Sequence, residues 1–580
     1  MRLNAVKLSF SIILILSIIV VPIRSDAAAL PSSGTQAGNY EKAIDLKVLG
    51  LFANTPDNFE LDRAPTRAEG AVMLVRLLGM EYQAKHGQYS HPFTDVPAWA
   101  DKYVGYIYQN GIANGISDTA FGSSRLMSAA QYVTFVLRSM GYKDNVDFSY
   151  SNALDKAADL RLLSTSESKR LKSSSSFLRN DLVAVSYNAL NVRMKGSSQT
   201  LLEKLVDTDK AIFRPAAQLL GLYPSESSRR YGNVELFNPP STNYGRIIKN
   251  KTELIKIITK TLINNDTSLD IDISGYEGSI SEELVSAFDI SYDAAEEITR
   301  VDGFIKEWSR ENSGRYIKLE FTYRYGKKDY NSRRDKIRAA IKKARYIIAE
   351  NINMDMPEFD KEKIIHDYIV NNTMYFDEKH PGNISPDDAY EEYGSLISGY
   401  AVCKGYAETM KLLCDLSGIE CMIITGKTVL NGEIVGHAWN IVKIDDEYYH
   451  VDVTNDDPLP TDGSRTQILT YCYFNLPDSE MMKKATWDRS AYPACTSITN
   501  SYYYKYNKVA DSREAFGQAL SKELEKKSPV IELKVTDDSK NACSDLSAFN
   551  HLFSAKSVTG YRYSIIEDVG VIRISNIKYY

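Results

Sequence analysis

Three stretches between about residues 40 and 207 follow one plan, and this internal repeat restricts the fold of the N-terminal third more than any other feature. The opening is clearest in the second stretch, at residues 93–121, and its second half, residues 129–140, has apolar residues at helical spacing. That second half recurs at residues 65–79 and, more weakly, within residues 153–190. One such unit is too small to bury its apolar faces, so we expect the three to pack together as an all-α region.

Each unit is predicted to be a helix, a loop and a second helix, with Thr66 capping the second helix and Glu69 completing a capping box. At these residues the chain resembles the S-layer homology (SLH) domain, a module found in triplets on exported bacterial proteins. The family's Thr-Arg-Ala-Glu signature is intact at residues 66–69 only. The resemblance implies binding to a secondary cell wall polymer through Thr66, Arg67 and Glu69, with repeats at 40–85, 93–144 and 147–207. The alternative is a plain helical scaffold.

The first residues, 1–29, have the charge, apolar run and small-residue site of a secretory signal peptide. The apolar run, residues 10–21, is short for a spanning helix, which needs about 20 residues. An uncleaved anchor is the alternative. No later stretch is apolar enough to span a bilayer, so we expect a secreted protein. The resemblance to SLH domains implies that it is held at the cell wall of a bacterium.

The composition, with 43% hydrophobic and 25% charged residues, is that of a globular protein, and 580 residues are enough for several domains. The net charge of −6 gives no indication of a nucleic-acid partner. All cysteines lie in the C-terminal third, which is not the pattern of a small disulfide scaffold, and their pairing stays open. They are Cys403, Cys414, Cys421, Cys472, Cys495 and Cys543.

A stretch rich in Ser, Pro, Asn and Gly predicts a linker at 208–247. Two small α+β units, 248–350 and 506–580, are predicted on either side of the central region because both contain a helix followed by alternating strands. We expect them to be supporting or recognition domains. The predicted elements are helices at 251–263 and 512–525 and strands at 315–323, 530–535 and 571–577.

Cys403 precedes a run of apolar residues at helical intervals that ends at Gly418, so it lies at or beside a helix N-terminus. Unpaired N–H groups and the helix dipole at that end lower the pKa of a cysteine, and the thiolate is the nucleophile. The same N–H groups can stabilise an oxyanion. The alternative for a single cysteine is a buried structural thiol.

Two strands are predicted downstream, at 436–444 and 448–454, joined by a polar turn. His437 begins the first strand and Asp452 lies late in the second, so the two side chains are expected side by side. The carboxylate then orients the imidazole while its other ring nitrogen faces Cys403.

Cys403, the Gly-His-Ala-Trp-Asn run at 436–440 and the Val-Asp-Val-Thr run at 451–454 together resemble a transglutaminase-like domain. The resemblance covers about residues 364–503, within a domain placed at 351–505. It implies a papain-like α+β fold, a catalytic triad of Cys403, His437 and Asp452, and thiol chemistry without a metal or an organic cofactor.

The sequence near the triad also contains other histidines, cysteines and acids. His450 is expected on the same strand face as Asp452, as a partner or a packed side chain. His366 lies within a helix and is expected to be structural. Cys414 and Cys421 lack further ligands at zinc spacing, and the acids after Asp452 lack calcium-loop spacing, so no metal site is predicted.

Three functional hypotheses follow from these residues. The first is a cysteine enzyme that acts on amide bonds of proteins or peptides through a thioester, with cross-linking and hydrolysis both open. The second is a cell-wall binding or structural protein with a vestigial triad. The third is a peptidoglycan peptide hydrolase.

Overall fold

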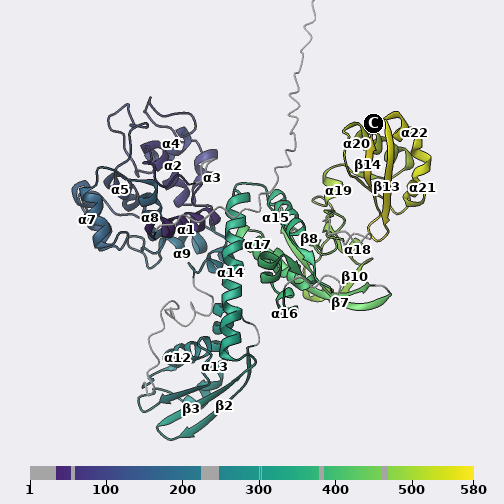
Figure 1. Cartoon of the computed structure of the whole chain (residues 1–580). Coiled ribbons are helices and arrows are strands. Elements are labelled where there is room, and N and C mark those ends of the chain that lie inside the picture. Colours follow the sequence, from purple (N-terminus) through teal and green to yellow (C-terminus); the bar gives the residue numbers. More distant parts are fainter. Residues whose placement is uncertain are drawn as a thin grey trace, which may run out of the picture.

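The computed structural model describes residues 34–53, 59–223, 247–299, 301, 304–377, 384–430, 432–458 and 468–580. The predicted signal peptide, residues 1–29, lies outside the described residues, and so does most of the predicted linker. Within the described ranges, no helix is both long enough and apolar enough to cross a membrane. Figure 1 shows N-terminal helices in purple and blue, a long teal helix, a green central part and a yellow C-terminal unit.

All named elements between residues 34 and 223 are helices, in agreement with the predicted all-α region. The predicted second helix of each repeat is present as α2 (Arg67–Leu77), α5 (Ala129–Ser139) and α8 (Arg179–Ala189). Thr66 and Ser128 cap the first two with full capping boxes. The others are α1 (Gly34–Val48), α3 (Glu81–His86), α4 (Asp101–Gln109), η1 (Tyr150–Asn152), α6 (Ala153–Asp159), α7 (Thr165–Ser173), α9 (Leu201–Glu203), η2 (Lys204–Thr208) and α10 (Arg214–Leu219).

The starts of α2 and α8 are hydrogen-bonded to neighbouring repeats. The amide of Arg67 donates to the carbonyl of Arg125 at 2.8 Å, and the amide of Arg179 donates to the carbonyl of Arg63 at 2.9 Å. One apolar core runs through all three units. The expectation that the units pack together therefore agrees with the structure, while their assignment as SLH repeats stays a prediction.

The predicted linker starts too early. Residues 208–223 are ordered and contain helix α10 (Arg214–Leu219), which places Ala216 and Ala217 in the core and contacts helix α17 (Cys403–Ser417). The Ser- and Gly-poor stretch around Ala216 has the apolar residues to bury a face, which is why it folds. Residues 224–246 lie outside the described residues.

The first α+β unit has a three-stranded antiparallel sheet in the order β1-β3-β2. The predicted helix at 251–263 is present with the same bounds, and the predicted strand at 315–323 corresponds to β3. The unit has its own apolar core. Its elements are α12 (Lys251–Ile263), β1 (Ser268–Asp272), α13 (Ile280–Thr299), β2 (Ile305–Ser313) and β3 (Tyr316–Tyr323).

Helix α14 (Lys327–Asn351) joins this unit to the rest of the molecule, as Figure 1 shows. Near its start Tyr330 belongs to the core of the α+β unit, whereas Ala344 and Ile348 belong to the core of the N-terminal helices and the central domain. The predicted boundary at 350 therefore falls at the end of a helix that both cores share.

The central domain contains the sheet β10-β6-β7-β8-β9, which is antiparallel throughout, with α17 packed against β6 and β7. This arrangement is the α+β architecture expected for the domain. Its strands are β4 (Met374–Tyr375), β5 (Tyr400–Ala401), β6 (Cys421–Leu430), β7 (Glu433–Ile444), β8 (Glu447–Val451), β9 (Phe474–Leu476) and β10 (Ala485–Trp487). Its helices besides α17 are α15 (Glu358–Asn372), α16 (Pro386–Ala389), η3 (Gly394–Ser398), α18 (Asp478–Met481), η4 (Arg489–Ala491) and α19 (Tyr502–Lys505).

The C-terminal unit has the sheet β11-β12-β14-β13, and it shares the topology of the first α+β unit. In both, a helix is followed by a strand, helical structure and a hairpin whose last strand lies in the middle. In both, a residue just before the helix pairs in parallel with the strand after the helix: Ile247 pairs with Asp272, and Ala510 pairs with Val535. The elements are β11 (Val509–Ala510), α20 (Arg513–Glu525), β12 (Ile531–Val535), α21 (Lys540–Ser544), η5 (Leu546–Phe549), α22 (Asn550–Ala555), β13 (Val558–Ile566) and β14 (Val571–Tyr579).

Candidate active site

Cys403 is the first residue of α17, as its sequence context predicts. Val402 before it is extended, and its amide donates to the carbonyl of Ala389 at 2.9 Å, which fixes the entry into the helix. Amides in the first turn of a helix have no partner within it and can stabilise negative charge. Five of the six cysteines are buried, whereas Cys403 is half-buried and therefore accessible to a substrate.

His437 and Asp452 lie together, as expected. His437 is on β7, and its Nε2 lies 2.7 Å from Oδ2 of Asp452. Asp452 is fully buried and lies one residue beyond β8 rather than within the strand, so the predicted strand at 448–454 is too long. The chain turns here because the amides of Asn455 and Asp456 donate to the carbonyl of Asp452.

His437 and the amide of Ala438 act on the Cys403 sulfur and favour its thiolate form. Burial alone would raise the pKa of Cys403, but these contacts outweigh burial and leave the pKa below its ordinary value. Because Nε2 of His437 faces Asp452, Nδ1 is the nitrogen left for the sulfur.

Burial would likewise lower the pKa of His437, but the Asp452 carboxylate and the Cys403 sulfur raise it to about 10. Burial raises the pKa of Asp452, and the His437 imidazolium more than offsets this, so the pKa falls below its ordinary range. The lowered pKa of Cys403 and the raised pKa of His437 both favour a thiolate–imidazolium pair.

Asn455 is a residue of this site that the sequence reasoning missed. Its Nδ2 donates to Oδ2 of Asp452 at 2.5 Å, and its amide donates to Oδ1 at 3.2 Å. The side-chain amide and the backbone amide of Asn455 therefore both help to hold the Asp452 carboxylate, which orients His437. The signal available in the sequence was an Asn three residues after an Asp at the end of a strand, a spacing typical of a side-chain-stabilised turn.

Asn440 and Trp439, both from the motif at 436–440, support the site from β7. Nδ2 of Asn440 donates to the carbonyl of Ala407 on α17 at 3.0 Å and to that of Met422 on β6 at 3.3 Å. This amide joins the helix that carries Cys403 to the sheet that carries His437. The indole of Trp439 stacks on the imidazole of His437, with centroids 5.7 Å apart and an angle of 20° between the rings.

His366 and Asp456 form a buried pair beneath the site, with Nε2 of His366 3.1 Å from Oδ2 of Asp456. Burial opposes ionisation of His366, but Asp367 and Asp456 raise its pKa to about 9. The other oxygen of Asp456 accepts from Thr470 and from the amide of Tyr473. These contacts fit the structural role expected for His366.

His450 is fully buried and faces Asp478, 2.9 Å away, rather than the triad. Cys414 and Cys421 are both buried free thiols. Among the described residues, no hydrogen bond joins His450, Cys414 or Cys421 to Cys403.

The residues predicted to bind a cell wall polymer lie at the start of α2. Arg67 is only 6% exposed and donates to the carbonyls of Phe121 at 2.9 Å and Asn114 at 2.7 Å. Thr66 caps the helix, and Glu69 pairs with Arg63 at 2.8 Å. Arg67 is therefore placed to support the neighbouring loops, and direct polymer contact by these residues stays a prediction.

Residues 347–453 match the sequence profile of the family described as "Transglutaminase-like superfamily". Two curated relatives each match a limited part of this chain. The Middle cell wall protein of Brevibacillus brevis is 27% identical over 33% of this chain and 19% of its own length. The Surface layer protein of Brevibacillus choshinensis is 30% identical over 25% of this chain and 14% of its own. The matched region thus spans less than a fifth of either relative.

Two solved structures are similar at 18% identity. One is the crystal structure of a TGase, with a TM-score of 0.18, covering 34% of this chain and 54% of that one. The other is a candidate cysteine protease from Cytophaga hutchinsonii, with a TM-score of 0.17, covering 28% and 65%. The part of this chain that matches the transglutaminase-like superfamily, residues 347–453, contains Cys403, His437 and Asp452.

Proposed function

We propose that this chain is a cysteine enzyme of the bacterial cell surface that cleaves or transfers amide-linked acyl groups of proteins or peptides. One observation carries the proposal. The half-buried thiol of Cys403 lies at a helix N-terminus, and His437, which lowers the pKa of that thiol against the effect of burial, has its Nε2 2.7 Å from the buried carboxylate of Asp452. This is the order of nucleophile, base and orienting group that thiol acyl transfer requires.

In the acylation step, the Cys403 thiolate attacks the substrate carbonyl carbon and forms a tetrahedral adduct. First-turn amides of α17 lie where they can stabilise the oxyanion. The His437 imidazolium then protonates the leaving amine, the C–N bond breaks and a thioester remains on Sγ. Asp452 keeps the imidazole oriented and stabilises its positive charge during the step.

In the second step, water or a primary amine attacks the thioester carbonyl. Neutral His437 takes the proton of the attacking group, the C–S bond breaks and the thiolate is restored. Water yields hydrolysis or deamidation, whereas an amine yields a cross-link. The triad supports both outcomes, so the acceptor is decided by groups outside it.

The proposed location is the cell wall or surface, after export by the signal peptide predicted at residues 1–29. It is supported by the names of the relatives, a middle cell wall protein and a surface layer protein. It is also supported by the three helical units, whose first copy retains the Thr-Arg-Ala-Glu run at residues 66–69. The N-terminal region then binds a secondary cell wall polymer and holds the enzyme near envelope peptides.

The test is a burst assay with p-nitrophenyl acetate on the full mature chain. Attack by Cys403 on the acetyl group releases p-nitrophenolate and leaves a +42 Da thioester, about one acetyl per chain, on the peptide that contains Cys403. Cys403→Ala should abolish the burst, and Cys543→Ala, at a buried thiol in the C-terminal unit, should leave it unchanged. A burst that persists in Cys403→Ala, or no burst in the wild type, contradicts the proposal and favours the binding protein with a vestigial triad.

Two acceptor assays then separate the possible reactions. Incorporation of dansylcadaverine into casein measures transfer to an amine, and ammonia release in its absence measures deamidation. Release of muropeptides from purified cell walls measures peptidoglycan peptide hydrolysis. Each signal should disappear in Cys403→Ala.

A further inference from the structure

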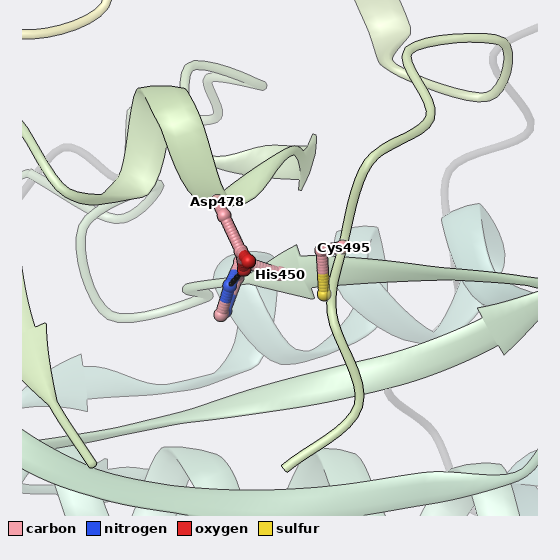
Figure 2. A group of neighbouring side chains, drawn as sticks. All are labelled: His450, Asp478 and Cys495. Carbon is pink, nitrogen blue, oxygen red and sulfur yellow. Dashed lines mark hydrogen bonds and ion pairs between the residues drawn. The ribbon is translucent and has the colours of Figure 1, made fainter. Parts of the chain in front are cut away.

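Figure 2 shows a buried group of three side chains, His450 on β8, Asp478 at the start of α18 and Cys495 in the segment after η4. Their ligand atoms lie within 4.8 Å of one another. Imidazole, carboxylate and thiolate are the groups that bind zinc in proteins. The group is therefore either a metal site or a hydrogen-bonded structure, and the protons on His450 distinguish the two.

The indole of Trp439 determines where His450 carries its proton. Nε1–H of Trp439 donates to Nδ1 of His450 at 3.0 Å, and an indole nitrogen can only donate. Nδ1 must therefore be unprotonated. Burial holds the pKa of His450 below its ordinary value, so the ring is neutral and its proton is on Nε2, which faces Oδ1 of Asp478 at 2.9 Å.

With its proton on Nε2 and with Nδ1 accepting from Trp439, His450 has no free nitrogen to bind a metal. A zinc ion on Nε2 would require a proton on Nδ1, where the N–H of Trp439 already points. Oδ2 of Asp478 is also occupied, because Nη2 of Arg489 donates to it at 3.2 Å. The contacts form a continuous chain in the order Trp439, His450, Asp478, Arg489.

The far end of this chain is the ring that lies against the catalytic imidazole. Trp439 and His437 are two residues apart on β7, so their side chains share one face and stack. The indole passes over Gly426 on β6, which pairs with His437, and a Cβ at Gly426 would lie 2.8 Å from the indole. Trp487 packs edge-on against the indole at 5.6 Å.

We propose that Trp439, His450 and Asp478 act as positioning residues for His437, an inference that rests on the proposed function of the triad. The hydrogen bond to Asp452 holds one nitrogen of His437 but allows the ring to rotate about that bond. The stacked indole limits this rotation, and its own orientation is fixed by the hydrogen bond to His450. Nδ1 of His437 is thereby kept pointing at Cys403.

The experiment measures the p-nitrophenyl acetate burst rate of the full chain, normalised to the folded fraction. His450→Phe keeps a ring but removes both hydrogen bonds, and should slow acylation about tenfold, since small misplacements of catalytic groups have effects of this size or larger. His450→Gln has an acceptor for Trp439 and a donor for Asp478, and should restore the rate to within about threefold of the wild type. A merely structural role predicts no such rescue at equal folded fraction.

Trp439→Phe keeps an aromatic ring at this position but removes the N–H together with part of the indole, and it decides the question if His450→Phe does not fold. Its acylation rate should also fall about tenfold. Cys495→Ala is the matched control, because Cys495 lies in the same group but outside the chain of hydrogen bonds, and its burst rate should be unchanged. Folded His450→Phe or Trp439→Phe with a wild-type rate overturns the inference.

The metal alternative is tested on the same proteins, purified from zinc-supplemented medium and analysed by plasma mass spectrometry. The inference predicts no stoichiometric zinc in the wild type. About one zinc per chain that is lost in Cys495→Ala would overturn the hydrogen-bonded arrangement. A wild type without any burst refutes the proposed function itself, which is a different result from a wild-type burst that the variants leave unaltered.

Discussion

At the scale of single residues, the charge on Cys403 is controlled by its neighbours on the sheet as much as by its helix. His437 and the amide of Ala438 lower the pKa of the thiol against the opposing effect of burial. Asp452 in turn keeps the pKa of His437 at about 10. The reactive form, with thiolate and imidazolium, therefore extends from below the ordinary thiol pKa of about 8.5 up to about pH 10.

The first prediction concerns this pH range. Iodoacetamide should alkylate Cys403 of the wild type at pH 6.5 faster than an ordinary thiol, because the lowered pKa leaves more of Cys403 as the thiolate. In His437→Ala the pKa of the thiol should rise, since burial is no longer opposed by the imidazolium, and the rate at pH 6.5 should fall at least about tenfold. His551→Ala, at an exposed histidine on α22, is the control. Peptide mass spectrometry gives the rates, and identical pH profiles in His437→Ala and the wild type would refute the prediction.

Glu362 provides a second prediction at this scale. It is fully buried on α15 and accepts from Nδ2 of Asn475 at 2.8 Å, and burial raises its pKa to about 8. The folded protein therefore holds a proton that the unfolded chain loses near its ordinary value of about 4.3, so stability falls as pH rises from there through 8.

Glu362→Gln stays neutral and should remove that loss. Relative to the wild type, the variant should gain at least about 1 kcal/mol of unfolding free energy between pH 5 and pH 8.5, since one pKa unit corresponds to about 1.4 kcal/mol. Calorimetric midpoints at the two pH values measure the gain. Asp360→Asn, on the exposed side of the same helix, should show none. Equal pH dependence in Glu362→Gln and the wild type would mean that Glu362 is not protonated when folded.

At the scale of elements, the triad requires α17 and the β6–β7 hairpin to keep a fixed distance. Asn440 makes that connection, because its amide nitrogen donates to carbonyls of both α17 and β6. The carbonyls it reaches, those of Ala407 and Met422, have no role in chemistry. These two hydrogen bonds nevertheless hold α17 against β6 and β7, and so hold the sulfur of Cys403 in place relative to the imidazole of His437.

Asn440→Asp tests this connection with an isosteric change. The carboxylate has no N–H and faces two carbonyl oxygens while 1% exposed, so we expect a loss of about 2–3 kcal/mol in stability. The burst rate of the folded fraction should fall as well. Asn507→Asp, in an exposed turn, is the control and should change neither quantity. Wild-type stability and burst rate in Asn440→Asp would show that α17 is held by other contacts.

At the scale of the whole molecule, α14 connects three parts of the chain. Arg345 of α14 lies 2.8 Å from Asp45 on α1 and also pairs with Glu41, and Tyr346 donates to Glu41 at 2.7 Å. The N-terminal helices therefore contact the helix that continues into the central core. If the N-terminal region is held at the cell wall, this contact determines how the active site is presented.

Arg345→Met should weaken the contact while preserving the buried aliphatic stem. We expect the N-terminal helices to melt at a lower temperature than the central domain, because the substitution removes the guanidinium that pairs with both Asp45 and Glu41 across this contact. Calorimetry of the full chain measures the separation. Arg338→Met, on the exposed face of the same helix, should melt as the wild type does. A single unchanged transition in Arg345→Met would show that the two regions do not depend on this ion pair.

The sequence by itself determined the local features of this protein. Helical spacing after Cys403, the capping box at Thr66 and the strand at 436–444 all depend on contacts within a few residues, and all are present in the structure. The order of Cys403, His437 and Asp452 along the chain was sufficient to indicate the site. The two α+β units were also visible because each contains a helix and strands with regular patterns.

Only the tertiary structure decided which side chains meet across the fold. The contact between Trp439 and His450 joins neighbouring strands, and those from His450 to Asp478 and from Asn440 to α17 join segments 28 and 33 residues apart. Sequence periodicity assigns a residue to a face but gives neither its partner nor its protonation state. For that reason the sequence did not indicate that Arg67 is buried, and it left open whether His450 is a partner of Asp452 or a packed side chain, whereas in the structure His450 faces Asp478.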